Sequence, residues 1–117
     1  MKTHTNPGEN EFEFVQVGSV EELKPSERLF VEIDGLEIVV FNINGVLFAT
    51  ADLCSHDDGP LGEGDLTDFE ISCPRHGARF DVRTGKALSL PAIVDIPAYP
   101  TRVVNSQIEI GVPIKEE

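Results

Sequence analysis

The feature that most constrains the fold of this sequence is a pair of short cysteine–histidine motifs. Cys54-Ser55-His56 places a thiol and an imidazole two positions apart, and Cys73-Pro74-Arg75-His76 places them three positions apart. These motifs hold both cysteines of the chain and two of its three histidines, and sixteen residues lie between His56 and Cys73. Thiolate and imidazole together are donors that zinc and iron–sulfur centres accept. We therefore predict a fold that brings two loops together around one metal centre.

The order of the ligands distinguishes two kinds of metal centre. A structural Cys₂His₂ zinc site usually takes two cysteines from one short segment and two histidines from another. Here each motif contributes one cysteine and one histidine, which suits a two-iron cluster with the cysteines on one iron and the histidines on the other. The spacing favours the cluster, and a zinc-stabilised binding module without redox function stays open as an alternative. The third histidine, His4, lies in a polar N-terminal segment and is predicted to be solvated.

The segments on either side of the motifs have the pattern of β-strands. Apolar and polar residues alternate in short runs, and Asp34-Gly35 and Asn44-Gly45 are dipeptides that favour tight hairpins. One helical turn is predicted at Val20–Lys24, with Ser19 as its cap. The predicted strands are Glu11–Val17, Leu29–Ile33, Leu36–Ile43, Val46–Thr50, Phe69–Ser72, Ala78–Val82, Ile93–Ile96, Thr101–Val104 and Gln107–Val112. The sequence thus predicts an all-β chain.

Length and charge limit the remaining possibilities. The 117 residues fit a single domain, 1–117, in which glycines and prolines interrupt the strand pattern from about residue 52 to 91. A formal net charge of −12 argues against nucleic acid and anionic membranes as partners, and it permits attraction to a basic protein. The N-terminus lacks the apolar stretch of a secretory signal, and the chain lacks a run long enough to cross a membrane. We therefore predict a cytoplasmic protein.

The two motifs and the residues after them resemble the binding loops of Rieske ferredoxins. The similar stretches are Cys54-Ser55-His56-Asp57, Cys73-Pro74-Arg75-His76-Gly77, Phe80-Asp81 and Thr84-Gly85-Lys86. The resemblance implies a sandwich of antiparallel sheets with a small inserted cluster-binding subdomain. It also implies one [2Fe–2S] cluster, with Cys54 and Cys73 on the inner iron and His56 and His76 on the outer iron.

Four positions depart from the Rieske proteins of respiratory bc-type complexes. Gly59 and Arg75 stand where those proteins have two further cysteines, which form a disulfide between the loops. Ala78 and Phe80 stand where those proteins have a serine and a tyrosine that donate hydrogen bonds to cluster sulfur. Because such donors stabilise the electron added on reduction, their loss predicts a potential at the low end of the Rieske range, which runs from about −150 to +300 mV.

The low-potential soluble members that this chain resembles are ferredoxin components of ring-hydroxylating oxygenase systems. That resemblance implies an electron carrier rather than an enzyme, a monomer that takes electrons from a ferredoxin reductase and passes them to a terminal oxygenase. The small subunit of assimilatory nitrite reductase stays open as a second reading. Six acidic residues crowd the insert and are predicted to form either a solvated rim or a docking face for basic partners: Asp52, Asp57, Asp58, Glu63, Asp65 and Asp68.

Overall fold

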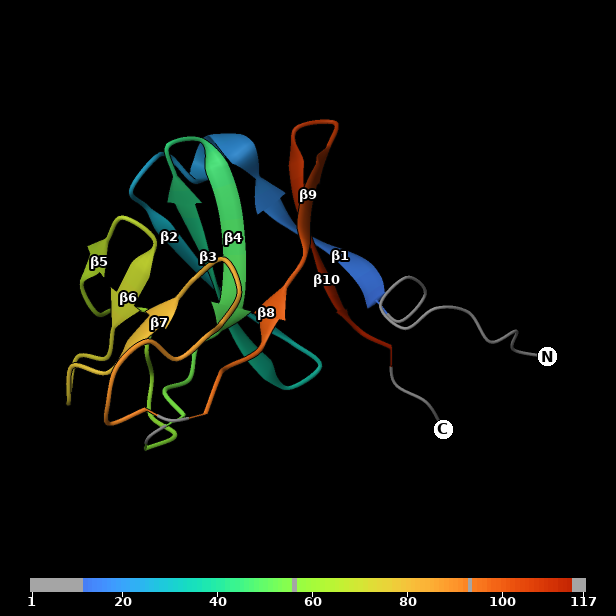
Figure 1. Cartoon of the computed structure of the whole chain (residues 1–117). Helices are drawn as coiled ribbons and strands as arrows, with labels where there is room; N and C mark the ends of the chain where they lie inside the picture. Colours follow the sequence, from blue (N-terminus) through green and yellow to red (C-terminus); the bar gives the residue numbers. More distant parts are fainter. Residues whose placement is uncertain (1–11, 56, 93, 115–117) are drawn as a thin grey trace.

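The computed structural model describes residues 12–55, 57–92 and 94–114, and these residues form antiparallel strands joined by turns and loops (Figure 1). The strands make three sheets, with the orders β1-β10-β9, β2-β3-β4-β8 and β5-β6-β7. Their bounds are β1 Phe12–Ser19, β2 Arg28–Ile33, β3 Leu36–Ile43, β4 Val46–Ala51, β5 Leu66–Thr67, β6 Glu70–Ser72, β7 Arg79–Asp81, β8 Ala98–Tyr99, β9 Thr101–Val104 and β10 Gln107–Pro113. The predicted all-β fold with antiparallel sheets is confirmed.

The hairpin turns lie where the dipeptides predicted them. Asp34 and Gly35 have φ of 52° and 83° between β2 and β3, and Asn44 and Gly45 have φ of 55° and 90° between β3 and β4. Positive φ at both central residues is the type I′ geometry, whose twist matches that of the flanking strands. The predicted helical turn is a single 3₁₀ turn, η1 (Val20–Glu22), which is shorter than expected.

Strand β3 separates two hydrophobic cores, because alternate side chains of a strand point to opposite faces of its sheet. Ile38 and Val40 face the sheet β1-β10-β9, whereas Val39 and Phe41 face the sheet β5-β6-β7 and its loops. We call the first group the scaffold core and the second the subdomain core. The subdomain core consists of Val39, Phe41, Cys54, Leu61, Ile71, Cys73, Ala78, Phe80, Val82, Ala92 and Ile96.

Polar contacts fix the subdomain onto the scaffold. The Arg28 guanidinium, at the start of β2, donates to the carbonyl oxygens of Gly62 and Gly64. The Asp52 carboxylate, just after β4, accepts hydrogen bonds from the backbone N–H groups of Leu61 at 2.9 Å and Gly62 at 2.6 Å. Asp52 therefore ties together the two ends of the loop that contains Cys54.

The predicted strand at Ile93–Ile96 is wrong in the part that the structure describes, since residues 94–96 are not in a strand; Ile93 itself lies outside the described residues. The N–H of Ile96 donates to the carbonyl of Gly85 at 2.8 Å, and the Asp95 carboxylate accepts from the N–H of Ala87. Because these groups bond to the turn after β7, they are not available to a sheet. The scaffold gains its fourth strand, β8, only after Pro97.

Candidate metal centre

The first ligand loop follows β4 and begins at Cys54. The Cys54 N–H donates to the carbonyl of Gly59 at 2.8 Å, and the Cys54 carbonyl accepts from the N–H of Asp58 at 2.7 Å. Asp58 has a φ of 62°, which allows the chain to reverse direction at that residue. Cys54 is completely buried in the subdomain core, so the loop presents its thiol inward.

The second ligand loop follows β6 and repeats the backbone pattern of the first. The Cys73 N–H donates to the carbonyl of Ala78 at 2.7 Å, and the Cys73 carbonyl accepts from the N–H of Gly77 at 2.9 Å. The spacings of five and four residues are those of the first loop, and Gly77, with a φ of 76°, matches Asp58. Two equivalent turns thus bring their first residues, Cys54 and Cys73, into one core.

The two cysteines form no disulfide, and they lie close to a carboxylate. Ligand atoms of Cys54, Asp57 and Cys73 all lie within 4.8 Å of one another. Burial raises the pKa of the Cys73 thiol, but hydrogen bonds from the backbone N–H groups of Arg75 and His76, a hydrogen bond with Cys54 and the charge of Arg75 together bring the pKa below its ordinary value. A thiolate that is already stabilised in this way is the form that binds a metal.

The predicted histidine ligands differ in what the structure shows of them. The His76 side chain is 49% exposed, and its Nε2 lies 3.6 Å from Oδ2 of Asp57. His56 lies outside the described residues. The structure therefore brings Cys54 and Cys73 together with the Asp57 carboxylate, which lies beside His76. The position of His56 stays a prediction.

Ser55, in the first ligand loop, contacts a later part of the chain. Its hydroxyl donates to the carbonyl of Val94. Leu90 and Val94 are 77% and 60% exposed, so these two apolar side chains lie at the surface.

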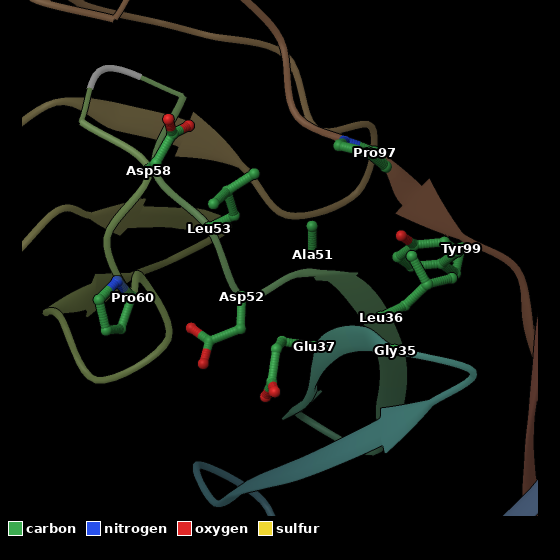
Figure 2. Close-up of a pocket in the computed structure, with 10 residues that line it drawn as sticks. All are labelled: Gly35, Leu36, Glu37, Ala51, Asp52, Leu53, Asp58, Pro60, Pro97 and Tyr99. Carbon is green, nitrogen blue, oxygen red and sulfur yellow. The ribbon is translucent and has the colours of Figure 1, made fainter.

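A cavity of about 450 Å³ opens beside the first ligand loop (Figure 2). The carboxylates of Asp52 and Glu37 lie on one side of it, and Leu36, Pro97 and Tyr99 form an apolar wall on the other. Its other lining residues are Gly35, Ala51, Leu53, Asp58 and Pro60. The cavity lies at the boundary between scaffold and subdomain and is not lined by either cysteine.

Sequence reasoning predicts the ligands but misses the groups that hold their loops. The sequence predicts a solvated rim or a docking face for Asp52 and Asp57, yet Asp52 binds backbone N–H groups and Asp57 forms an ion pair with Arg75. The role of Arg28 was not predicted at all. The partners in these contacts are far apart in the sequence and leave no local sequence pattern. Only the folded chain therefore shows them.

Comparison with known proteins agrees with the motifs. The model of the Rieske [2Fe-2S] domain matches residues 13–100. The chain is 34% identical to the ferredoxin component of the naphthalene 1,2-dioxygenase/salicylate 5-hydroxylase systems of a Ralstonia species, over 81% of this chain and 91% of that relative.

Solved structures of similar chains lead to the same family. The ferredoxin of carbazole 1,9a-dioxygenase from Nocardioides aromaticivorans IC177 is 34% identical, with a TM-score of 0.79 over 83% of this chain and 95% of that one. A ferredoxin in a complex of reduced oxygenase and oxidised ferredoxin of carbazole 1,9a-dioxygenase is 27% identical, with a TM-score of 0.77 over 82% and 99%.

The chain therefore belongs to the Rieske [2Fe–2S] family, and the family resemblance predicted from its ligand motifs is confirmed. Its relatives are ferredoxin components of dioxygenase systems, as the sequence predicted, and membership of the family implies a [2Fe–2S] cluster. The donor set fits that cluster, because two buried thiols lie close together and the exposed imidazole of His76 contacts Asp57, whose carboxylate lies near both sulfur atoms. Among the described residues, no helix is long and apolar enough to span a membrane.

Proposed function

We propose that this chain carries single electrons within a ring-hydroxylating oxygenase system. Cys54 and Cys73 would hold one iron of the [2Fe–2S] cluster, and His56 and His76 would hold the other. The observation that carries the proposal is the contrast in exposure, with the cysteines at 0% and 2% and the His76 side chain at 49%. That contrast sets the cysteines in the core and an imidazole at the surface where a partner protein can approach.

The bound cluster would supply reversible one-electron transfer, and the residues of this chain set the conditions for it. The subdomain core keeps water away from the sulfur atoms of Cys54 and Cys73. Backbone N–H groups of Arg75 and His76 stabilise negative charge on the Cys73 sulfur. His76 is the exposed member of the proposed ligands that the structure describes, so we assign electron exit to it.

The same surroundings support a low reduction potential. Ala78 and Phe80 are fully buried in the subdomain core with the cysteines, and neither has a hydroxyl group. Hydrogen bonds to the sulfurs are one of the factors that set the potential of such clusters, and the two side chains add none. We expect a midpoint potential near the lower limit of the Rieske range, about −150 mV, and a value above about +100 mV would contradict this.

The proposed partners are a ferredoxin reductase and a terminal oxygenase. The complex of oxygenase and ferredoxin known for a carbazole 1,9a-dioxygenase relative supports the second partner. We further propose that the chain forms one domain, 1–117, with a cluster-binding subdomain at about 52–91, and that it acts as a cytoplasmic monomer. The curated relatives favour this role over the nitrite reductase subunit that the sequence left open.

Anaerobically purified protein tests the proposal. We expect a coloured sample with two iron atoms and two sulfide ions per chain that one electron reduces reversibly. A colourless protein with one zinc ion per chain would overturn the proposal in favour of the zinc-stabilised module. Capture of the oxygenase or of nitrite reductase by the tagged protein from its own host separates the two redox roles.

A further inference from the structure

The two ligand loops are joined by the side chain of Arg75. Its Nε and Nη2 donate to Oδ2 and Oδ1 of Asp57 at 2.6 and 2.9 Å, a forked pairing from the second loop to the first. Its Nη1 donates to the carbonyl of Pro60 at 2.8 Å. One guanidinium thus makes three hydrogen bonds to the opposite loop, and two parallel bonds to a carboxylate fix its orientation as well as its distance.

The first loop has a space that the guanidinium fills. A Cβ atom at Gly59 would lie 2.6 Å from Nη2, 2.7 Å from Cζ and 3.0 Å from Nε of Arg75. Gly59 does not have a positive φ, so its backbone does not require glycine, and the space for Arg75 is the physical reason for it. The N–H of Gly59 also donates to Oδ1 of Asp57 at 3.0 Å, which orients the carboxylate toward the arginine.

Charge strengthens this contact on both sides. The hydrogen bonds join a guanidinium to a carboxylate, and such charge-assisted bonds are shorter and stronger than bonds between neutral groups. Both residues are exposed, so the paired geometry of the hydrogen bonds, and not burial, gives the contact its strength.

Other arginine pairs of the described residues do not join the ligand loops. Arg79 pairs with Glu70 across β6 and β7, and Arg83 makes a forked pair with Asp81 two positions away. The Arg83 pair has the same chemistry and a similar geometry as the Arg75 pair, but it closes only a local turn. It is therefore a matched control for the effect of joining two loops.

We propose that Arg75 is a positioning residue, which together with Asp57 and Gly59 forms a clamp that holds the two ligand loops closed and slows loss of the cluster. This inference rests on the proposed cluster ligation. The clamp acts through geometry, because it fixes the distance between the turns that carry Cys54 and Cys73. It is a noncovalent link between two loops that no disulfide joins, since Cys54 and Cys73 are buried and form no disulfide.

The experiment measures how fast visible absorption bleaches when each holoprotein is mixed with an excess of a strong iron chelator. Arg75→Gln, Asp57→Asn and the double variant each open the clamp, and we expect about fivefold faster bleaching in all three. The double variant should be no faster than the single variants, because they remove the same contact. Arg83→Gln should bleach at the wild-type rate.

The midpoint potential supplies a second readout, which distinguishes positioning from a charge effect. Reduction adds negative charge, so Arg75→Gln should lower the potential and Asp57→Asn should raise it, with the double variant near wild type. If the bleaching rate also changes in opposite directions in the two single variants, faster in one and slower in the other, the clamp is overturned. A charge effect alone would then explain the rates. Bleaching at the wild-type rate in both would overturn it too.

The wild-type sample separates the clamp from the proposed function. If the wild-type protein holds no cluster, then the proposed function fails, and the clamp fails with it. If the wild-type protein holds the cluster and Arg75→Gln retains it equally long, only the clamp is wrong.

Discussion

At the scale of single residues, the site depends on what surrounds each sulfur atom. Cys73 receives backbone N–H groups from its own loop, and the residues packed around the two cysteines are apolar. This arrangement stabilises a thiolate without supplying side-chain hydroxyl donors. Adding one hydroxyl group beside a cysteine should therefore change the reduction potential of the centre.

Phe80→Tyr adds one hydroxyl beside the cysteines, and we expect it to raise the midpoint potential. A hydrogen bond of about 1 kcal/mol to the reduced state corresponds to about 40 mV for one electron. Phe48→Tyr, on β4, is the control and should leave the potential unchanged. Voltammetry of the three proteins measures the difference. An equal potential in Phe80→Tyr and wild type would exclude the missing hydroxyl at Phe80 as a cause of the low potential that we predict.

The ion pair of Arg75 and Asp57 predicts insensitivity to pH. The pKa of Asp57 in the folded protein lies below its ordinary value of 3.8. The stabilisation that the ion pair gives the folded protein is therefore fully present above pH 3.8, and it is lost only as the pH falls through the lowered pKa. The ratio of bleaching rates between Arg75→Gln and wild type should stay constant from about pH 6 to 9. A ratio that falls toward one within that range would show that the pair is not ionised as the structure indicates.

At the scale of elements, β3 links the scaffold to the metal centre. Val39 and Val40 are adjacent, both fully buried and of the same size, but they belong to different cores. Packing loss at either position should weaken the whole fold, while only Val39 supports the loops that carry the ligands.

Val39→Ala and Val40→Ala should therefore lower the free energy of unfolding by similar amounts, about 2 kcal/mol each. Only Val39→Ala should also accelerate bleaching by the chelator under conditions in which both proteins are folded. Denaturant unfolding and bleaching rates measure the two effects. Equal bleaching rates in the two variants would show that the subdomain core does not control cluster retention.

The elements also show what the sequence could predict and why the remainder was out of reach. Local signals were sufficient where a turn or a strand depends on neighbouring residues, as at Asp34-Gly35 and Asn44-Gly45. They failed at Ile93–Ile96. The apolar pattern indicates that Ile96 is buried, but it does not show that the N–H of Ile96 bonds to Gly85. The clamp was missed for the same reason, since Arg75 and Asp57 are joined only after both loops fold.

At the scale of the whole molecule, the net charge of −12 gives the surface a negative field. Part of the acidic rim is used internally, because Asp52 binds backbone N–H groups and Asp57 pairs with Arg75. Asp58 and Glu63 are exposed on the first loop and the segment after it. These two can attract a basic partner toward the side of the molecule that carries the centre.

We expect electron transfer from the reduced protein to a basic cytochrome c to slow about tenfold between 0.01 and 0.15 M ionic strength, as the screening length falls from about 30 to 8 Å. Asp58→Asn/Glu63→Gln should weaken this salt dependence more than Glu13→Gln/Glu21→Gln, which removes the same charge from the scaffold. Stopped-flow kinetics measures both, and a flat salt profile in wild type would exclude electrostatic attraction.

The central claim is that two cysteines and two histidines of this chain hold one [2Fe–2S] cluster. Pulsed electron paramagnetic resonance of the reduced protein, with ¹⁵N only in histidine, tests it directly. We predict magnetic coupling to two histidine nitrogens, from His56 and His76, and coupling to one in His76→Cys if the variant keeps its cluster. A reduced cluster without coupling to histidine nitrogen would contradict the ligand assignment.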